Sequence, residues 1–255
     1  MSSLRARCPD CRTFTAVAVG VGYECHACGR EFAAGLVRVP RAWGADGQAL
    51  ADGANLTVPY PEAGVVARDT LDEQTAELAA MLPERPLVLG GCCCAHVGAV
   101  RGLVGRVDRL AVVWLDAHGD LNTPETSPSG NLWGMPLRML LEDGVVAPED
   151  VALVGARSLD PPEQDYLDKT GIDDSLERAL AGADALYLAL DLDVLDPDAA
   201  EVFVPEPEGP TIEQIEVTLR DAVSRVALVG MGVTGHVRDE RNVTVVSRLL
   251  AAAGL

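Results

Sequence analysis

The sequence lacks the features that would place the chain in a membrane or on a nucleic acid. It has no uninterrupted apolar run of about eighteen residues or more, so we expect no membrane-spanning segment. Basic residues are scarce: 20 Lys and Arg stand against 39 Asp and Glu, and the formal net charge is −19. A surface of this charge repels phosphates and anionic lipids, so neither a membrane nor a nucleic acid is expected as a partner.

A disulfide framework is also missing. The seven cysteines are an odd number, divided between four with paired spacing and a run of three at 92–94. Residues 1–12 are polar and do not resemble a signal peptide. This thiol usage is typical of a reducing compartment, so we expect a cytoplasmic protein.

The four paired cysteines have the spacing of a zinc ribbon. Two C-x2-C pairs are separated by thirteen residues, and the pairs consist of Cys8, Cys11, Cys25 and Cys28. Each pair presents two thiolates to one ion, and two pairs complete a tetrahedron. His26 lies inside the second pair, and we interpret it as a bystander. We predict a zinc ribbon over residues 1–36, stabilised by its structural zinc because so short a segment cannot build a core.

The remaining residues, 37–255, predict an α/β domain. Short apolar runs read as buried strands at 36–39, 55–59, 86–90, 110–115, 151–155, 185–192 and 226–231. Amphipathic segments read as helices at 69–82, 95–104, 161–169, 174–182, 211–222 and 239–253. Such alternation predicts a three-layer α/β/α fold whose mostly parallel sheet is covered on both faces. The functional site of such a fold lies beyond the carboxyl ends of the strands.

Acidic residues follow two of the predicted strands. The strand at 110–115 runs into Asp116, His118 and Asp120, and the strand at 185–192 ends in Asp191 and Asp193. Residues i and i+2 of a strand point to the same side, so each strand end can aim two ligands at one ion. Buried carboxylates need compensation, and a pair of divalent metals supplies it. Oxygen-rich ligands with one imidazole favour manganese; the alternative is that these aspartates only cap loops and helices.

These motifs resemble those of the arginase family of ureohydrolases, which includes agmatinases and formimidoylglutamases. The resemblance covers roughly residues 85–245. The run at 116–131, DAHGDLNTPETSPSGN, is similar to the family's ligands and substrate loop, and LDLDVLDP at 190–197 is similar to its second ligand motif. The resemblance implies attack of a metal-bridging hydroxide on a guanidinium carbon, which releases urea. It also implies a homo-oligomer.

The resemblance further implies a role for each acidic ligand. Asp116 and Asp191 would bridge two metal ions. Asp120 would complete the coordination of one ion and take part in catalysis, and His118 and Asp193 would complete that of the other.

The loop after the first motif carries residues of the types that bind an amino acid in arginases. By resemblance, Asn122, Ser127 and Ser129 would hold the α-carboxylate, and Asp160 would reach the α-amino group. These types favour an amino-acid-like substrate over agmatine. The alternative is ordinary hydrogen bonding within a turn.

The sequence departs from the family pattern at a position where arginases have a histidine that binds metal. The run at 90–96 reads GGCCCAH, and Cys93 stands at the ligand position. A thiolate there would shift the metal preference toward softer ions such as zinc. His96, about one helical turn further on, is an alternative ligand, or else a residue on the helix surface.

Two further departures concern the reaction itself. Trp133 stands where arginases have a histidine thought to move protons, and tryptophan cannot act as an acid or base. Thr234 occupies the substrate-binding slot of a glutamate that pairs with the guanidinium. His236 is a candidate proton shuttle, and Glu206 and Glu208 lie in a loop that approaches the site or stays in solvent.

Three hypotheses follow. The first is a binuclear metal-dependent hydrolase acting on a C–N bond of a guanidino or amidine amino-acid-like molecule, with its substrate altered by the departures. The second is a non-catalytic metal- or amino-acid-binding regulatory protein that uses the ribbon to contact a partner. The third is a redox or nucleophilic centre at cysteines 92–94.

Overall fold

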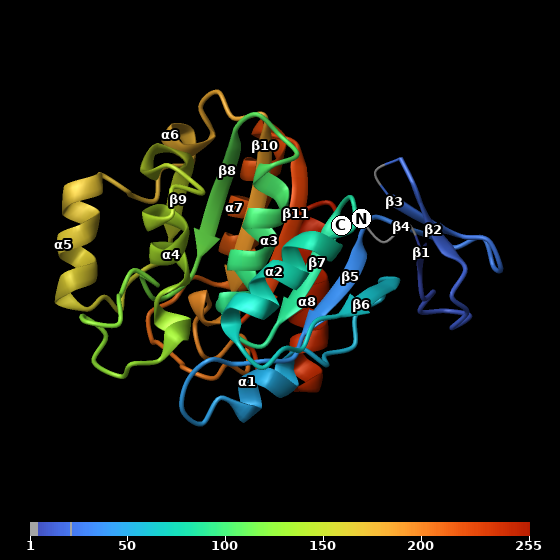
Figure 1. The fold of residues 1–255 in the computed structure, drawn as a ribbon, viewed down its shortest axis with the longest axis horizontal. Helices are drawn as coiled ribbons and strands as arrows, with labels where there is room; N and C mark the ends of the chain where they lie inside the picture. The colour runs from blue at the N-terminus through green and yellow to red at the C-terminus, as the bar shows by residue number, and fades with distance from the viewer. Residues whose placement is uncertain (1–4, 21) are drawn as a thin grey trace.

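The computed structural model describes residues 5–20 and 22–255, and its first element is a small antiparallel sheet. Four short strands follow one another in the order β1-β2-β3-β4. They are β1 (Arg5–Ala6), β2 (Ala16–Val19), β3 (Gly22–Cys25) and β4 (Glu31–Phe32). This sheet lies to one side of the main body in Figure 1, and we call it the ribbon.

The main body is built on a seven-stranded sheet with the order β6-β5-β7-β11-β10-β8-β9. Every neighbouring pair in this sheet is parallel. The strands are β5 (Gly35–Val39), β6 (Glu62–Val65), β7 (Pro86–Gly90), β8 (Leu110–Leu115), β9 (Val151–Val154), β10 (Ala185–Asp191) and β11 (Leu228–Thr234). The sheet confirms the predicted α/β class with a parallel sheet.

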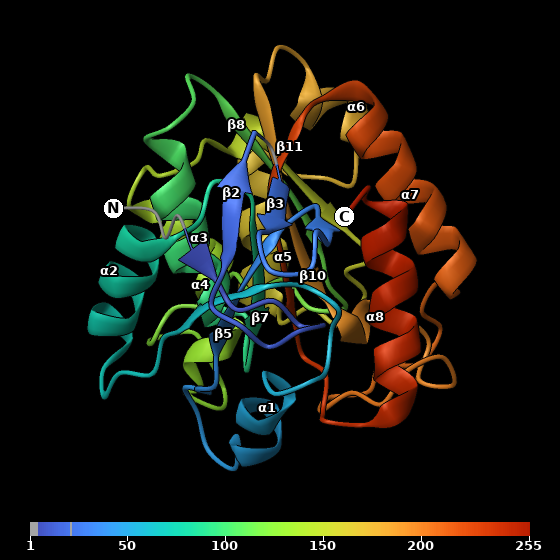
Figure 2. The same cartoon turned by 90° about the vertical axis from the view of Figure 1, so that its right-hand side faces the viewer.

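Helices cover both faces of this sheet. They are α1 (Gln48–Gly53), α2 (Leu71–Met81), α3 (Cys94–Val104), α4 (Pro136–Glu142), α5 (Pro161–Thr170), α6 (Leu176–Leu180), α7 (Ile212–Arg225) and α8 (Glu240–Ala252). Short 3-10 turns occur at η1 (Leu132–Gly134), η2 (Pro148–Asp150) and η3 (Leu192–Val194). Figure 2 shows α7 and α8 on one side of the sheet and α2, α3 and α4 on the other.

The two faces bury separate hydrophobic cores. Successive strand side chains point to opposite faces, so Leu87 and Leu89 of β7 pack in one core while Val88 packs in the other. The first core includes Leu249 of α8, and the second includes Leu78 of α2. The central strand β10 is buried along its whole length, which explains its continuous apolar run.

One predicted strand is wrong. Residues 55–59 form no strand, although Leu56 and Val58 are buried in the core. Pro59 and Pro61 follow closely, and proline has no N–H to donate to a sheet ladder. The edge strand β6 therefore begins only at Glu62.

The ribbon is joined to the main sheet at this edge. Arg7 and Glu62 form an isolated antiparallel bridge with N···O distances of 2.7 and 2.9 Å. Arg38 of β5 pairs with the Glu62 carboxylate at 3.0 Å. The ribbon thus covers part of an edge strand that would otherwise present unpaired backbone groups.

Among the residues that the structure describes, none of the helices has the length and apolar character needed to cross a membrane.

Candidate metal centre and active site

A cavity of about 240 Å³ opens at the carboxyl ends of the central strands. The arrowheads of β7 and β8 point toward this end of the sheet, which is the lower edge in Figure 1. Metal-ligand types line one side of the cavity: Cys93, Asp116, His118, Asp120, Asp191 and Asp193. Residues of the predicted substrate loop line another: Asn122, Ser127, Ser129 and Asp160. The fold therefore brings the two sequence motifs to one space.

The segment after β8 turns back on itself at the site. The backbone N–H of His118 donates to Asp116 Oδ1 at 2.7 Å, and the indole N–H of Trp114 donates to Asp116 Oδ2 at 3.2 Å. Asp120 has a positive φ of 53°, a left-handed conformation that non-glycine residues rarely adopt. This backbone turn is what directs the Asp120 side chain back toward the strand ends.

The end of β10 carries the second pair of carboxylates. The backbone N–H of Asp193 donates to Asp191 Oδ1 at 2.9 Å, and the N–H of Ala117 donates to Asp193 Oδ1 at 3.1 Å. Gly235 has a φ of 71°, and a Cβ there would overlap the Asp191 carboxylate. The glycine therefore allows the chain after β11 to pass directly beside this ligand.

Two groups of ligand atoms form in this way, each with its members within 4.8 Å of one another. We call the group of Cys93, Asp116 and Asp191 position A, and the group of Asp116, His118 and Asp193 position B. In position A, Cys93 Sγ lies 2.8 Å from Asp191 Oδ2. In position B, His118 Nδ1 lies 3.4 Å from Asp116 Oδ1 and 3.1 Å from Asp193 Oδ2. Asp116 belongs to both groups, whereas Asp191, the other predicted bridging ligand, belongs to position A alone and Asp120 to neither.

Concentrated negative charge perturbs these groups. Burial, followed by the neighbouring aspartates, raises the pKa of Asp191 to about 7 and that of Asp193 to about 6. The pKa of Asp120 is raised well above its ordinary value by the same causes. Burial opposes protonation of His118, but its bonds to Asp116 and Asp193 raise its pKa to about 12. Without a cation, the protein must hold protons here.

The donor set fits divalent metal ions. Asp120 Oδ2 is buried and, within the part of the chain that the structure describes, has no hydrogen-bond partner. An unpaired buried carboxylate oxygen is costly unless a cation meets it. With the two groups that share Asp116, this orphaned oxygen indicates a two-ion centre.

The substrate loop forms a polar wall. Asn122 Nδ2 donates to Asp160 Oδ2 at 2.8 Å, and Thr126 Oγ1 donates to Asn122 Oδ1 at 2.9 Å. The hydroxyls of Ser127 and Ser129 lie 3.4 Å apart. Some of these contacts are hydrogen bonds within a turn, as the alternative interpretation expects. All four predicted residues also line the cavity.

An apolar wall stands beside it. Trp133 and Phe203 line the cavity and pack edge to face, with ring centroids 5.8 Å apart. Leu50 of α1 lies in the same cluster. Trp133 therefore shapes the cavity and offers no acid–base group, in agreement with the sequence.

His96 and Thr234 lie beneath the cavity. Both are fully buried and neither lines it. His96 is thus not a residue of the helix surface. Its Nδ1 lies 3.0 Å from the Tyr187 hydroxyl, and its Nε2 lies 3.1 Å from Thr234 Oγ1. Both ring nitrogens are engaged, so the geometry favours Cys93 over His96 as the ligand and gives Thr234 no direct access to a substrate.

His236 and the glutamates of the loop before α7 differ in their placement. His236 is fully buried, and its ring nitrogens face the carbonyls of Gly53 at 2.9 Å and Thr234 at 3.2 Å. It does not line the cavity, which speaks against a proton shuttle. Glu206 approaches the centre, with Oε1 3.4 Å from His118 Nε2, whereas Glu208 lines a different surface hollow.

Glu163 is a functional candidate that sequence reasoning missed. It is buried, lines the cavity, and accepts hydrogen bonds from the backbone N–H groups of Leu121 and Asp160, each at 2.9 Å. It thereby fixes the substrate loop against the start of α5. The signal was available, because Asp160 followed three residues later by Glu is a capping-box pattern.

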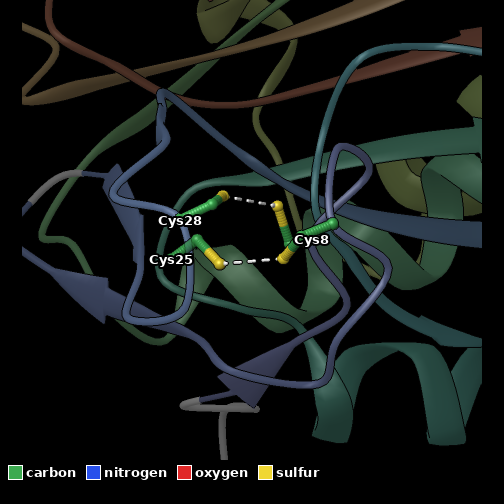
Figure 3. A group of neighbouring side chains, drawn as sticks. Cys8, Cys25 and Cys28 are labelled. Carbon is green, nitrogen blue, oxygen red and sulfur yellow. Dashed lines mark hydrogen bonds between the residues drawn. The ribbon is translucent and has the colours of Figure 1, made fainter.

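The four cysteines of the ribbon also gather at one point. Their Sγ atoms all lie within 4.8 Å of one another, and Figure 3 shows Cys25 and Cys28 pointing toward Cys8. Cys8 and Cys28 are 3.7 Å apart, and Cys11 and Cys25 are 3.5 Å apart. A tetrahedron with Zn–S bonds of about 2.3 Å places its sulfurs about 3.8 Å apart. Exposed His26 is not in the group.

Comparison with known proteins identifies the family. The protein-family model described as "Arginase family" matches residues 34–235, which is most of the chain. The chain therefore belongs to the arginase family. The arginase of Bacillus subtilis (strain 168) is 41% identical over 150 residues, covering 47% of this chain and 50% of that protein. The arginase of Bacillus caldovelox is 37% identical over 164 residues, covering 52% and 55%. The chain thus spans about half the length of the curated relatives it matches.

Solved structures agree over a longer stretch. The arginase from Bacillus cereus superposes with a TM-score of 0.74 at 25% identity, covering 86% of this chain and 96% of that one. A formimidoylglutamase from Bacillus subtilis has the same fold, with a TM-score of 0.69 at 15% identity. The curated relatives above are named arginase, so they do not support the altered substrate that the departures led us to expect.

Proposed function

We propose that this protein hydrolyses the guanidinium C–N bond of L-arginine, or of a close amino-acid analogue, with two divalent metal ions. One observation carries the proposal: positions A and B, which have Asp116 in common, line the same cavity as the substrate loop. Two bound ions would lower the pKa of a shared water and so supply a nucleophile near neutral pH. Manganese suits the oxygen-rich donors of position B. A regulatory protein without catalysis is not favoured by these observations.

The charge of the cavity supports a cationic substrate. No lysine or arginine of the described residues lines it, whereas six carboxylates do. The charge of two divalent ions would offset that of the four ligand aspartates. The carboxylates of Asp160 and Glu163 would then remain without a countercharge. Negative charge therefore remains to attract a guanidinium and an α-amino group.

The polar wall supports an α-amino acid as the rest of the substrate. The Ser127 and Ser129 hydroxyls and the Asn122 amide present donors of the kind that hold a carboxylate. Asp160, fixed by Asn122, presents a carboxylate to an ammonium group. A substrate held at this wall extends its other end toward the metal centre, because both line the same cavity.

We test this by measuring urea release from L-arginine and from agmatine, which lacks the α-carboxylate. We expect L-arginine to be preferred, and Asp160→Asn to raise KM for arginine about tenfold or more through loss of one charged contact. Asp165→Asn, on the exposed face of α5, is the matched control. Urea release that is equal from both compounds and unaffected by Asp160→Asn would refute the amino-acid assignment.

Metal content tests the centre itself. We expect about two ions besides the zinc of the ribbon, and their loss in Asp116→Ala with Asp191→Ala, accompanied by a loss of urea release of at least about a thousandfold. Ribbon zinc should remain in that variant. If the purified protein binds no ion beyond this zinc and releases no urea, the hydrolase proposal fails and a binding protein becomes the better description.

We also propose that the four ribbon cysteines hold one structural zinc ion. The sulfur spacing supports a tetrahedral site. A homo-oligomer is proposed from the family resemblance alone, and light scattering of the purified protein tests it.

A further inference from the structure

We infer that Cys93 is a thiolate ligand held in place by a buried hydrogen-bond chain, so that position A selects a borderline ion such as Zn²⁺, Fe²⁺ or Co²⁺ over Mn²⁺. This inference rests on the proposed two-metal centre and assigns different preferences to its two positions. It concerns Cys93, Thr234, His96 and Tyr187, all of which are at most 4% exposed.

The position of the sulfur is the first step. Cys93 precedes α3 and directs its Sγ at the carboxylates, 2.8 Å from Asp191 Oδ2 and 3.7 Å from Asp116 Oδ2. Without an ion, the sulfur is a neutral thiol that donates to Asp191 Oδ2, because a thiolate beside two carboxylates would lack a countercharge. A cation at position A would instead bind the sulfur and both oxygens together.

The second step is a chain of contacts that leads away from the sulfur into the core. Cys93 Sγ lies 3.2 Å from Thr234 Oγ1, which lies 3.1 Å from His96 Nε2. His96 Nδ1 then lies 3.0 Å from the Tyr187 hydroxyl. A Cβ at Gly232 would overlap both the Tyr187 hydroxyl and the His96 ring, so glycine provides the space for this chain.

The donors and acceptors along this hydrogen-bond chain have one self-consistent order. Among the described residues, the Tyr187 hydroxyl has no acceptor other than His96 Nδ1, so it donates there. His96 Nε2 then carries the proton and donates to Thr234 Oγ1. The Thr234 hydroxyl then faces three acceptors: Cys93 Sγ and Asp191 Oδ2, each at 3.2 Å, and the more distant Leu190 carbonyl at 3.4 Å. The two ligand atoms are the nearer ones. The buried chain thus delivers a donor to the anionic side of position A.

The chemical consequence is a difference between the two positions. Position A combines a thiolate with carboxylates, and thiolates favour softer ions. Position B combines carboxylates with the His118 imidazole, a set that Mn²⁺ accepts. Thr234 is a positioning residue here, and it acts on the metal through Cys93 and Asp191.

The experiment is cobalt titration of the full chain, read by absorption and metal content. Cys93→Ser is compared with wild type, and Cys94→Ser is the matched control, because it is the neighbouring buried thiol. The ribbon cysteines are common to all variants, so their absorption cancels in the difference spectra. We expect wild type and Cys94→Ser to show a near-ultraviolet thiolate-to-cobalt band that Cys93→Ser lacks.

Two further variants sharpen the result. Cys93→His should keep cobalt bound without the extra band and shift the Zn²⁺/Mn²⁺ preference more than tenfold toward Mn²⁺. Thr234→Val should weaken cobalt binding at position A about 10–100-fold and move the band, and Thr234→Ser should restore both. These readouts do not depend on turnover.

The outcomes separate this inference from the proposed function. If Cys93→Ser retains the wild-type spectrum while Asp116→Ala with Asp191→Ala loses two cobalt ions, the thiolate inference is overturned and the two-metal centre stands. If that double variant binds as much cobalt as wild type, the centre itself is refuted. An unchanged Zn²⁺/Mn²⁺ preference in Cys93→His also overturns the inference.

Discussion

The two cysteine clusters of this protein illustrate how surroundings decide what a thiol does. In the ribbon, four sulfurs meet one another across short strands, close to solvent, and no carboxylate belongs to the group. At the main centre, one sulfur meets buried carboxylates at the end of a parallel sheet. The first arrangement suits an ion that holds a small fold together. The second suits ions that keep chemistry available to a substrate.

The two regions also differ in how they are stabilised. The main domain has two hydrophobic cores, one on each face of its sheet. Among the described residues, the core of the ribbon contains six that are buried, two of which are its own cysteines. We therefore expect the ribbon to depend on its proposed zinc ion for folding, and the main domain to fold around an empty centre.

The largest expected effect comes from removing one thiolate of the ribbon. Cys25→Ser should release the ribbon zinc and unfold residues 5–32, because binding of a structural zinc contributes about 10–16 kcal/mol to such small folds. Limited proteolysis should then cut the ribbon within minutes, while the main domain keeps its other metals. Glu31→Gln, at an exposed position of β4, serves as control. Coincident loss of the main-domain metals would show that the two regions are not independent.

A smaller effect is expected at the outer partner of position B. Glu206 faces His118 Nε2 while Nδ1 faces the carboxylates, so Glu206 orients the imidazole. Glu206→Gln should weaken binding at position B about tenfold without changing the zinc content of the ribbon. Glu208→Gln in the same loop is the matched control. Equal affinities in the two variants would remove Glu206 from the centre.

The smallest effect concerns pH. The folded, metal-free protein holds Asp193 and Asp191 with pKa values of about 6 and about 7, above the ordinary 3.8. The contribution of these two aspartates to the free energy of unfolding is therefore fully present below pH 3.8, the pKa of the unfolded chain. It is lost as the pH rises through their folded pKa values of about 6 and about 7. His118, with a pKa of about 12 against 6.5, acts in the same direction above pH 6.5.

Bound metal replaces these protons, so the loaded protein should not share this loss. We expect the difference in melting temperature between Mn²⁺-loaded and metal-free protein to grow by about 5 °C from pH 5 to pH 7.5. Differential scanning calorimetry at several pH values measures it. A constant difference would mean that the carboxylates are compensated without metal.

Much of the site was predictable because its residues are fixed by short-range pattern. Asp116 and His118 follow one apolar strand and Asp191 and Asp193 another, and parallel strands bring their carboxyl ends to one edge. The paired spacing of the ribbon cysteines predicted their cluster in the same way. These features need only the period of a strand and the reach of a tight turn.

The errors came from side chains whose role depends on the opposite side of the fold. His96 was open between ligand and helix surface, and only the packing of α3 against β10 and β11 brings it to Tyr187 and Thr234. The apolar run at 55–59 predicted a strand, but its prolines leave it as a buried coil.

By itself, then, the sequence determined the α/β class, the edge of the sheet where the acidic motifs meet, and the cysteine pairs, because periodicity and spacing act locally. Tertiary structure alone decided that Cys93 faces Asp191, that Glu206 reaches His118, and that His236 turns toward backbone carbonyls. These contacts join residues that are far apart in the chain. Their geometry depends on how helices and loops pack across the sheet, which no local pattern specifies.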